Sequence, residues 1–131
     1  MDRIAKPVIA VVDDDSRVRE SLASLFESVG FTARVFSLAK DFLQKGFLEG
    51  ASCLITDVRM PGMDGLDLQR CVRLERPDLP VIFITGHHDD EVERCAFAQG
   101  AAFFIRKPFD AEELLRAVRI ALSEASGNHG P

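Results

Sequence analysis

Acidic side chains gather directly after two apolar segments of this chain. Asp13, Asp14 and Asp15 follow the first apolar run, residues 8–12, and Asp57 follows the third. Carboxylates held close together repel one another and raise one another's pKa unless a cation compensates. Oxygen ligands of this kind suit Mg²⁺, which prefers octahedral coordination and keeps some of its waters. The acidic positions therefore predict a magnesium site, provided that the fold brings them together.

Two further polar residues come at or after the ends of later apolar runs. Thr85 closes the fourth run and Lys107 comes shortly after the fifth. Phosphoryl transfer requires a nucleophile, a divalent ion that neutralises the phosphoryl oxygens, and fixed donors for the remaining oxygens. A carboxylate, a magnesium site, a hydroxyl and an ammonium group supply all of these. The set as a whole predicts a phosphoryl-transfer site.

The elements that must position these residues are short strands alternating with helices. Three of the five apolar runs are continuously hydrophobic, which is typical of central strands in a parallel sheet with both faces covered. Parallel neighbours need right-handed helical crossovers. We therefore expect an α/β fold with a five-stranded parallel sheet of flavodoxin-like order 2-1-3-4-5, a (βα)5 unit with helices on both faces. The expected strands are residues 8–12, 32–36, 53–56, 81–84 and 102–105.

Each connection between strands, and the segment after the last strand, carries one periodic apolar pattern. The expected helices lie within residues 16–30, 38–46, 68–77, 92–100 and 114–122. In an open parallel sheet, ligands bind beyond the carboxyl ends of the strands where the strand order reverses, which here is between the first and third strands. Both acidic positions would meet at that point.

Composition limits the remaining classes of function. The 131 residues are 47% hydrophobic and carry a net charge of −5, as expected of one folding domain without the basic surface of nucleic-acid binders. The longest early apolar run is too short for a membrane span or a secretory signal, so we expect a cytoplasmic protein that binds neither membranes nor nucleic acid directly. The three cysteines form no Cys-x-x-Cys pair and are expected to be reduced core thiols.

Four motifs occur in the same order as in a known family. They are VVDDD at residues 11–15, LITDVRMPGMDG at 54–65, ITG at 84–86 and KPF at 107–109. Together they resemble the receiver (CheY-like) domain of two-component response regulators, over roughly residues 6 to 124. The sequences around Asp57 and Thr85 look most like the FixJ-type branch, whose receivers usually control a helix-turn-helix output domain.

The resemblance assigns a role to each matching residue. Asp57 matches the acceptor that takes a phosphoryl group from the phosphohistidine of a sensor histidine kinase. Asp14 matches a direct Mg²⁺ ligand, as does Asp57, and the main-chain carbonyl of Arg59 matches a third. Asp13 matches the residue that acts mainly through a metal-bound water. Lys107 matches the lysine that pairs with a phosphoryl oxygen.

Three other positions match the switching part of the family. Thr85 corresponds to the hydroxyl that closes on a phosphoryl oxygen, and Phe104 to the aromatic residue that turns inward when the threonine moves. Pro108 corresponds to a proline that often follows a cis peptide bond and fixes the turn that aims the lysine. The resemblance thus implies a bistable surface around the helix marked by Val92 and the last strand, with phosphorylation-dependent homodimerisation as the output.

The resemblance also implies a domain plan and a class of activity. Residues 1–124 would be the receiver, and residues 125–131 a flexible tail or the start of a linker to a DNA-binding output domain outside this chain. The receiver would be a signalling domain and not an enzyme acting on other molecules, although it would promote its own phosphotransfer and dephosphorylation. Its output would be transcriptional.

Two other functions remain open from the residues. Asp13 and Asp15 reproduce the Asp-x-Asp signature of haloacid-dehalogenase-type phosphohydrolases, with Asp13 as nucleophile, although Arg17 departs from that pattern. Alternatively, the chain is a receiver-like interaction module that is never phosphorylated, since fold does not imply function.

Overall fold

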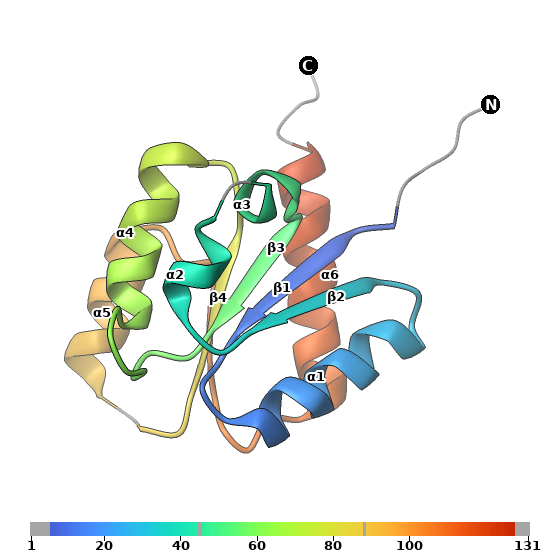
Figure 1. Cartoon of the computed structure of the whole chain (residues 1–131), viewed down its shortest axis with the longest axis horizontal. Helices are drawn as coiled ribbons and strands as arrows, with labels where there is room; N and C mark the ends of the chain where they lie inside the picture. Colours follow the sequence, from blue (N-terminus) through green and yellow to red (C-terminus); the bar gives the residue numbers. More distant parts are fainter. Residues whose placement is uncertain (1–5, 45, 88, 128–131) are drawn as a thin grey trace.

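The sheet has the expected strands in the expected order. The structure, a computed structural model, describes residues 6–44, 46–87 and 89–127. Five parallel strands lie in the order β2-β1-β3-β4-β5 (Figure 1). They are β1 (Val8–Val12), β2 (Thr32–Phe36), β3 (Cys53–Thr56), β4 (Val81–Thr85) and β5 (Phe103–Arg106). The predicted flavodoxin-like order is confirmed.

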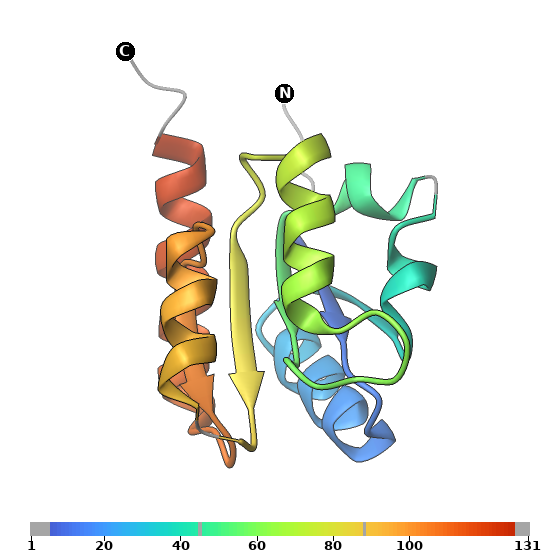
Figure 2. The same cartoon turned by 90° about the vertical axis from the view of Figure 1, so that its left-hand side faces the viewer.

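Helices cover both faces of this sheet. One face packs against α1 (Ser16–Ser28) and α6 (Ala111–Gly127), and the other against α2 (Ala39–Phe42), α3 (Phe47–Gly50), α4 (Gly65–Glu75) and α5 (Asp90–Ala98) (Figures 1 and 2). Because every residue of β3 and β4 is buried, these central strands contribute side chains to both cores. The alternation of side chains along each strand explains the two separate clusters.

The connection between β2 and β3 differs from the prediction. We expected one helix within residues 38–46, but the described residues form two short helices, α2 and α3. Gly46 has a φ of 94°, which an α-helix does not tolerate, and its amide donates to the Glu49 side chain at the start of α3. The crossover between β2 and β3 therefore carries two short helices where one was expected.

The last helix is also longer than expected. Periodicity predicted an end near Leu122, and residues 125–131 were expected to form a tail, but α6 continues to Gly127. No proline or glycine interrupts residues 123–126, and Ala125 favours helix, so polarity alone did not end it. Residues 128–131 lie outside the described part, and the boundary at 124 stays a prediction.

None of the helices in the described part of the chain combines the length and the hydrophobicity that a membrane span requires.

The cysteines differ in burial, which corrects the expectation of three core thiols. Cys53 in β3 is buried, whereas Cys71 is half-buried and Cys95 is exposed. Burial raises the pKa of the Cys53 thiol to about 12. Because this pKa lies above the ordinary value, Cys53 contributes stability below pH 9 that is lost as the pH rises toward 12.

Alkylation should separate these thiols. At pH 8 we expect iodoacetamide to modify Cys95 in the folded protein and to leave Cys53 unmodified, because the thiolate is the nucleophile and Cys53 is protonated and inaccessible. Peptide mass spectrometry checks this, with a urea-unfolded sample as the control in which both thiols react. Equal labelling of Cys53 and Cys95 in native buffer would contradict the observed packing.

Candidate functional site

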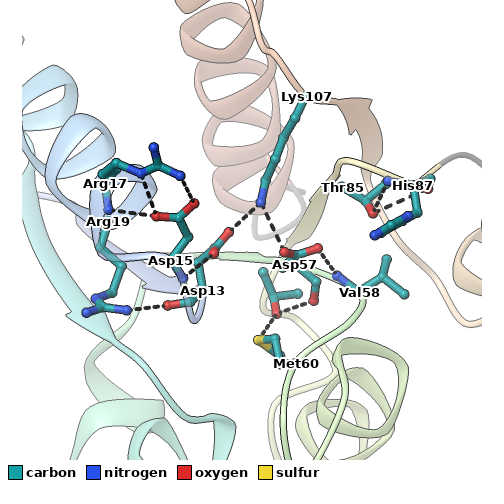
Figure 3. Close-up of polar contacts among 11 residues, drawn as sticks. Asp13, Asp15, Arg17, Arg19, Asp57, Val58, Met60, Thr85, His87 and Lys107 are labelled. Atoms are coloured by element: carbon teal, nitrogen blue, oxygen red, sulfur yellow. Dashed lines mark hydrogen bonds and ion pairs between the residues drawn. The ribbon is translucent and has the colours of Figure 1, made fainter.

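The site lies where the first and third strands end side by side. β1 pairs with β3 in parallel, with Val12 opposite Thr56, so the next residues, Asp13 and Asp57, leave the sheet together. Figure 3 shows their carboxylates facing each other below the Lys107 side chain. This position is the point at which the strand order reverses, as the sequence predicted.

Four atoms of Asp57 make hydrogen bonds: its amide nitrogen, its carbonyl oxygen and both carboxylate oxygens. Its amide donates to the Val12 carbonyl at 3.1 Å, and its own carbonyl accepts from the Thr56 hydroxyl at 2.9 Å. One carboxylate oxygen, Oδ1, accepts from the Val58 amide at 2.7 Å, and the other faces Lys107. With a partner on each oxygen and only 8% of the residue exposed, this carboxylate has a fixed direction.

Asp13 is buried and equally constrained. Its Oδ1 accepts from the Asp15 amide at 2.9 Å, and its Oδ2 accepts from Lys107. Burial raises the pKa of Asp13 above its ordinary value, although the hydrogen bonds from Asp15 and Lys107 oppose the rise. The negative charge of Asp57 adds to the rise. A second cation at this point would relieve that penalty.

Lys107 joins the two carboxylates. Its Nζ donates to Oδ2 of Asp13 and to Oδ2 of Asp57, both at 3.0 Å. Burial by itself would lower the pKa of Lys107, but the hydrogen bonds to Asp57 and Asp13 raise it above its ordinary value. The ammonium group is therefore charged, and it lies beside Oδ2 of Asp57. The peptide bond from Lys107 to Pro108 is cis.

Three of the predicted acidic residues form one cluster. Carboxylate oxygens of Asp13, Asp14 and Asp57 lie within 4.8 Å of one another. A set of hard, anionic oxygen donors with one exposed member fits Mg²⁺ better than it fits a metal that prefers nitrogen or sulfur. The Arg59 guanidinium is a cation without an acceptor atom, so only the main-chain carbonyl of Arg59 could be a ligand.

Asp15 points away from this cluster. Its carboxylate caps α1 through the Arg17 amide at 2.9 Å and pairs with the Arg17 side chain at 3.3 Å. These hydrogen bonds hold the pKa of Asp15 below its ordinary value. Asp15 is therefore a capping residue, and it does not face Asp13 as a general acid would.

Two predicted switch residues are not joined to the cluster. The Thr85 hydroxyl is buried and exchanges hydrogen bonds with the main chain of His87, at 3.1 and 3.3 Å (Figure 3). Phe104 is half-buried, with ring centroids 5.8 Å from Phe83 and 6.4 Å from the exposed Phe97. Phe104 of β5 thus packs between Phe83 of β4 and Phe97 of α5.

Two residues contact the site in ways that the sequence analysis did not predict. A Cβ on Gly65, the first residue of α4, would overlap the main-chain oxygen of Asp57 and lie 3.0 Å from Val58 Cα. On the other side, Arg19 of α1 donates from Nη1 to the Asp13 carbonyl at 2.7 Å. A glycine in a turn and an arginine on a helix are too common to signal either contact.

Comparison with known proteins decides the family. Residues 9–119 match the sequence profile of the response regulator receiver domain. The chain belongs to this receiver family. The predicted family is thereby confirmed, and the receiver is a signalling domain of two-component regulators.

Individual relatives agree with this assignment. The receiver is 46% identical over 118 residues to the response regulator protein TodT of Pseudomonas putida, covering 90% of this chain and 52% of TodT. It is 41% identical over 118 residues to the transcriptional regulatory protein FixJ of Azorhizobium caulinodans, covering 90% and 56%. The solved structure of the response regulator StyR superposes with a TM-score of 0.86 at 39% identity, covering 95% and 63%.

These relatives also limit the assignment. The receiver spans about half the length of the curated relatives it matches, so their complete activities are not carried over directly. FixJ is among them, in agreement with the predicted branch. The haloacid-dehalogenase alternative is not favoured, because the family match covers most of the chain and Asp15 serves as a helix cap.

Proposed function

We propose that this receiver accepts a phosphoryl group on Asp57 from the phosphohistidine of a sensor histidine kinase. The observation that carries the proposal is the fixed Asp57 carboxylate, with Val58 and Lys107 each donating to one of its oxygens. In the transfer, an Asp57 oxygen forms a bond to phosphorus while the phosphorus–nitrogen bond to imidazole breaks. The imidazole keeps the electron pair and takes up a proton.

Each neighbour of Asp57 then has a task. Lys107 moves its hydrogen bond from the carboxylate to a phosphoryl oxygen and balances part of the new charge. Asp13, Asp14, Asp57 and the main-chain carbonyl of Arg59 would hold Mg²⁺, Asp13 mainly through a water. When bound, Mg²⁺ neutralises negative charge on the phosphoryl oxygens. The chain thus promotes its own phosphotransfer and dephosphorylation.

The proposed output is a change of surface. A phosphoryl group on Asp57 attracts the Thr85 hydroxyl away from the main chain of His87, because the anionic oxygens are better acceptors than a carbonyl. The space that Thr85 leaves can be filled by Phe104, which lies between Phe83 and Phe97. The face formed by α5 and β5 then changes shape, and we propose that it forms a homodimer.

One proposed partner is an output domain. Because the receiver covers only 52% of TodT and 56% of the transcriptional regulatory protein FixJ, we propose that it controls a C-terminal DNA-binding output domain outside this chain. The receiver itself, with a net charge of −5, is not expected to contact nucleic acid. Its cytoplasmic location stays a prediction.

Phosphorylation of Asp57 can be measured directly. We expect acetyl phosphate with Mg²⁺ to add one phosphoryl group to the wild type and none to Asp57→Ala, as read by intact mass. Asp13→Ala should label more slowly, by roughly 100-fold, because one member of the cation site is lost. Asp15→Ala is the matched control, since it removes a carboxylate that faces Arg17 and should label normally.

The same samples separate the alternatives. A phosphohydrolase with Asp13 as nucleophile would lose labelling in Asp13→Ala and Asp15→Ala and keep it in Asp57→Ala. A wild type that gains no adduct would be an unphosphorylated interaction module. Size-exclusion chromatography of the labelled wild type tests the dimer, which should be absent from Asp57→Ala.

A further inference from the structure

Arg19 holds the backbone that carries two acidic residues of the site. Its Nη1 donates to the main-chain oxygen of Asp13 at 2.7 Å (Figure 3). The Arg19 amide donates to the Asp15 carbonyl at 3.1 Å. Arg19 therefore contacts the carbonyls of both residues that flank Asp14, and only the contact with Asp13 uses its side chain. The side chain of Arg19 is half-buried, which strengthens a charged hydrogen bond relative to an exposed one.

Asp14 depends on this backbone for its direction. Asp13 has two donors on its carboxylate, but within the described part of the chain no hydrogen bond or ion pair holds the exposed carboxylate of Asp14. An Asp14 oxygen nevertheless lies within 4.8 Å of oxygens of Asp13 and Asp57. The orientation of the peptide between residues 13 and 14 sets that position.

We propose that Arg19 is a positioning residue that orients Asp14 toward a bound Mg²⁺ by fixing the Asp13 carbonyl. The inference rests on the proposed function, because it concerns the cation site of the same receiver. It assigns Arg19 no contact with Mg²⁺ or with the phosphoryl group.

Electrostatics alone predicts the opposite change in Mg²⁺ affinity when Arg19 is removed. Arg19 carries a positive charge close to the acidic cluster, so its removal would by Coulomb's law strengthen the binding of a cation. If positioning dominates, its removal weakens binding. A purely structural role in α1 would lower the free energy of unfolding without moving the Mg²⁺ affinity of the folded protein.

Arg17 supplies a matched control on the same helix. Its side chain is 89% exposed and pairs with Asp15, and among the described residues it makes no hydrogen bond or ion pair with Asp13. Arg17→Ala removes the same charge two residues away and leaves the Asp13 carbonyl in place. Its Mg²⁺ affinity should equal that of the wild type or be slightly higher.

The experiment is a Mg²⁺ titration followed by ¹H–¹⁵N NMR of the Asp14 and Val58 amides, since the chain has no tryptophan or tyrosine for a fluorescence signal. We expect Arg19→Ala to weaken Mg²⁺ binding about tenfold, the scale of one hydrogen bond from a charged donor. Arg19→Lys should recover part of the affinity, because an ammonium group can still donate to the carbonyl. Arg19→Met keeps the aliphatic stem and carries the test if Arg19→Ala does not fold.

The outcomes distinguish the two proposals. If the wild type binds Mg²⁺ and Arg19→Ala or Arg19→Met binds it equally or more tightly, the positioning role is wrong and the proposed function stands. If the wild type neither binds Mg²⁺ nor gains a phosphoryl group on Asp57, the proposed function fails and the role of Arg19 fails with it. Weakening by Arg17→Ala to the same degree would also overturn the positioning role.

Discussion

Gly65→Ala is expected to destabilise the receiver by about 3 kcal/mol and to lower its melting temperature by about 10 °C. The added methyl group would overlap the Asp57 carbonyl and press on Val58 Cα at 3.0 Å. Both obstacles are backbone atoms, and the Gly65 amide is itself tied to the Val58 carbonyl at 2.8 Å. Relief therefore requires α4 or the end of β3 to move.

The backbone shift in Gly65→Ala should also slow the phosphorylation of Asp57. Because the Asp57 carbonyl and carboxylate belong to one residue, a shift that accommodates the methyl group changes the direction of the nucleophile. We expect slower labelling by acetyl phosphate even at temperatures where Gly65→Ala is folded. Gly50→Ala is the control, since a Cβ there meets nothing within 4 Å and should leave stability unchanged or slightly higher. Equal melting temperatures for Gly65→Ala and the wild type would contradict this prediction, because they would mean that α4 can shift without a loss of stability.

The strands could be predicted because their signal is local. Each is a short apolar run, and each predicted boundary lies within one residue of the observed one. The missed helix α3 also depends on contacts that no short sequence window contains. The Arg76 guanidinium donates to the carbonyls of Leu48, Glu49 and Ala51 and is held by Asp78. That contact stabilises α3 from 25 or more positions away.

Some features of the candidate site could likewise be predicted from the sequence, and others could not. Asp13, Asp57 and Lys107 could be placed together from sequence because each follows a strand, and parallel strands end at the same edge. The hydrogen bonds of Thr85 with His87 could not be predicted, because the hydroxyl direction depends on one rotamer and one turn. Gly65 and Arg19 act on backbone atoms of the aspartates, and a glycine near a turn or an arginine on a helix is too common in sequences to signal such a contact.

Lys107→Met is expected to make folding depend on a divalent cation. The ammonium group lies 3.0 Å from both Asp13 and Asp57, whose side chains are 1% and 11% exposed. Without it, two charges within 4.8 Å remain facing each other, a repulsion of about 3 kcal/mol at an effective dielectric constant of about 20. In EDTA at neutral pH we therefore expect a loss of about 2–3 kcal/mol in the free energy of unfolding, measured by urea denaturation.

Added Mg²⁺ should reverse most of this loss. A ligand that binds only the folded state stabilises it, and binding should be about tenfold tighter once the competing ammonium group is gone. Acidification should reverse it too, since the folded-state pKa of Asp13 is raised and the cost of ionising Asp13 appears only as the pH rises through that value. Labelling of Asp57 should nevertheless fall about 100-fold, because Mg²⁺ does not replace the donor aimed at the phosphoryl oxygen. Lys40→Met, at an exposed position on α2, is the control that should respond to neither Mg²⁺ nor acid differently from the wild type. A Lys107→Met variant as stable in EDTA as in Mg²⁺ would contradict the role of Lys107 as the cation that holds the two carboxylates together.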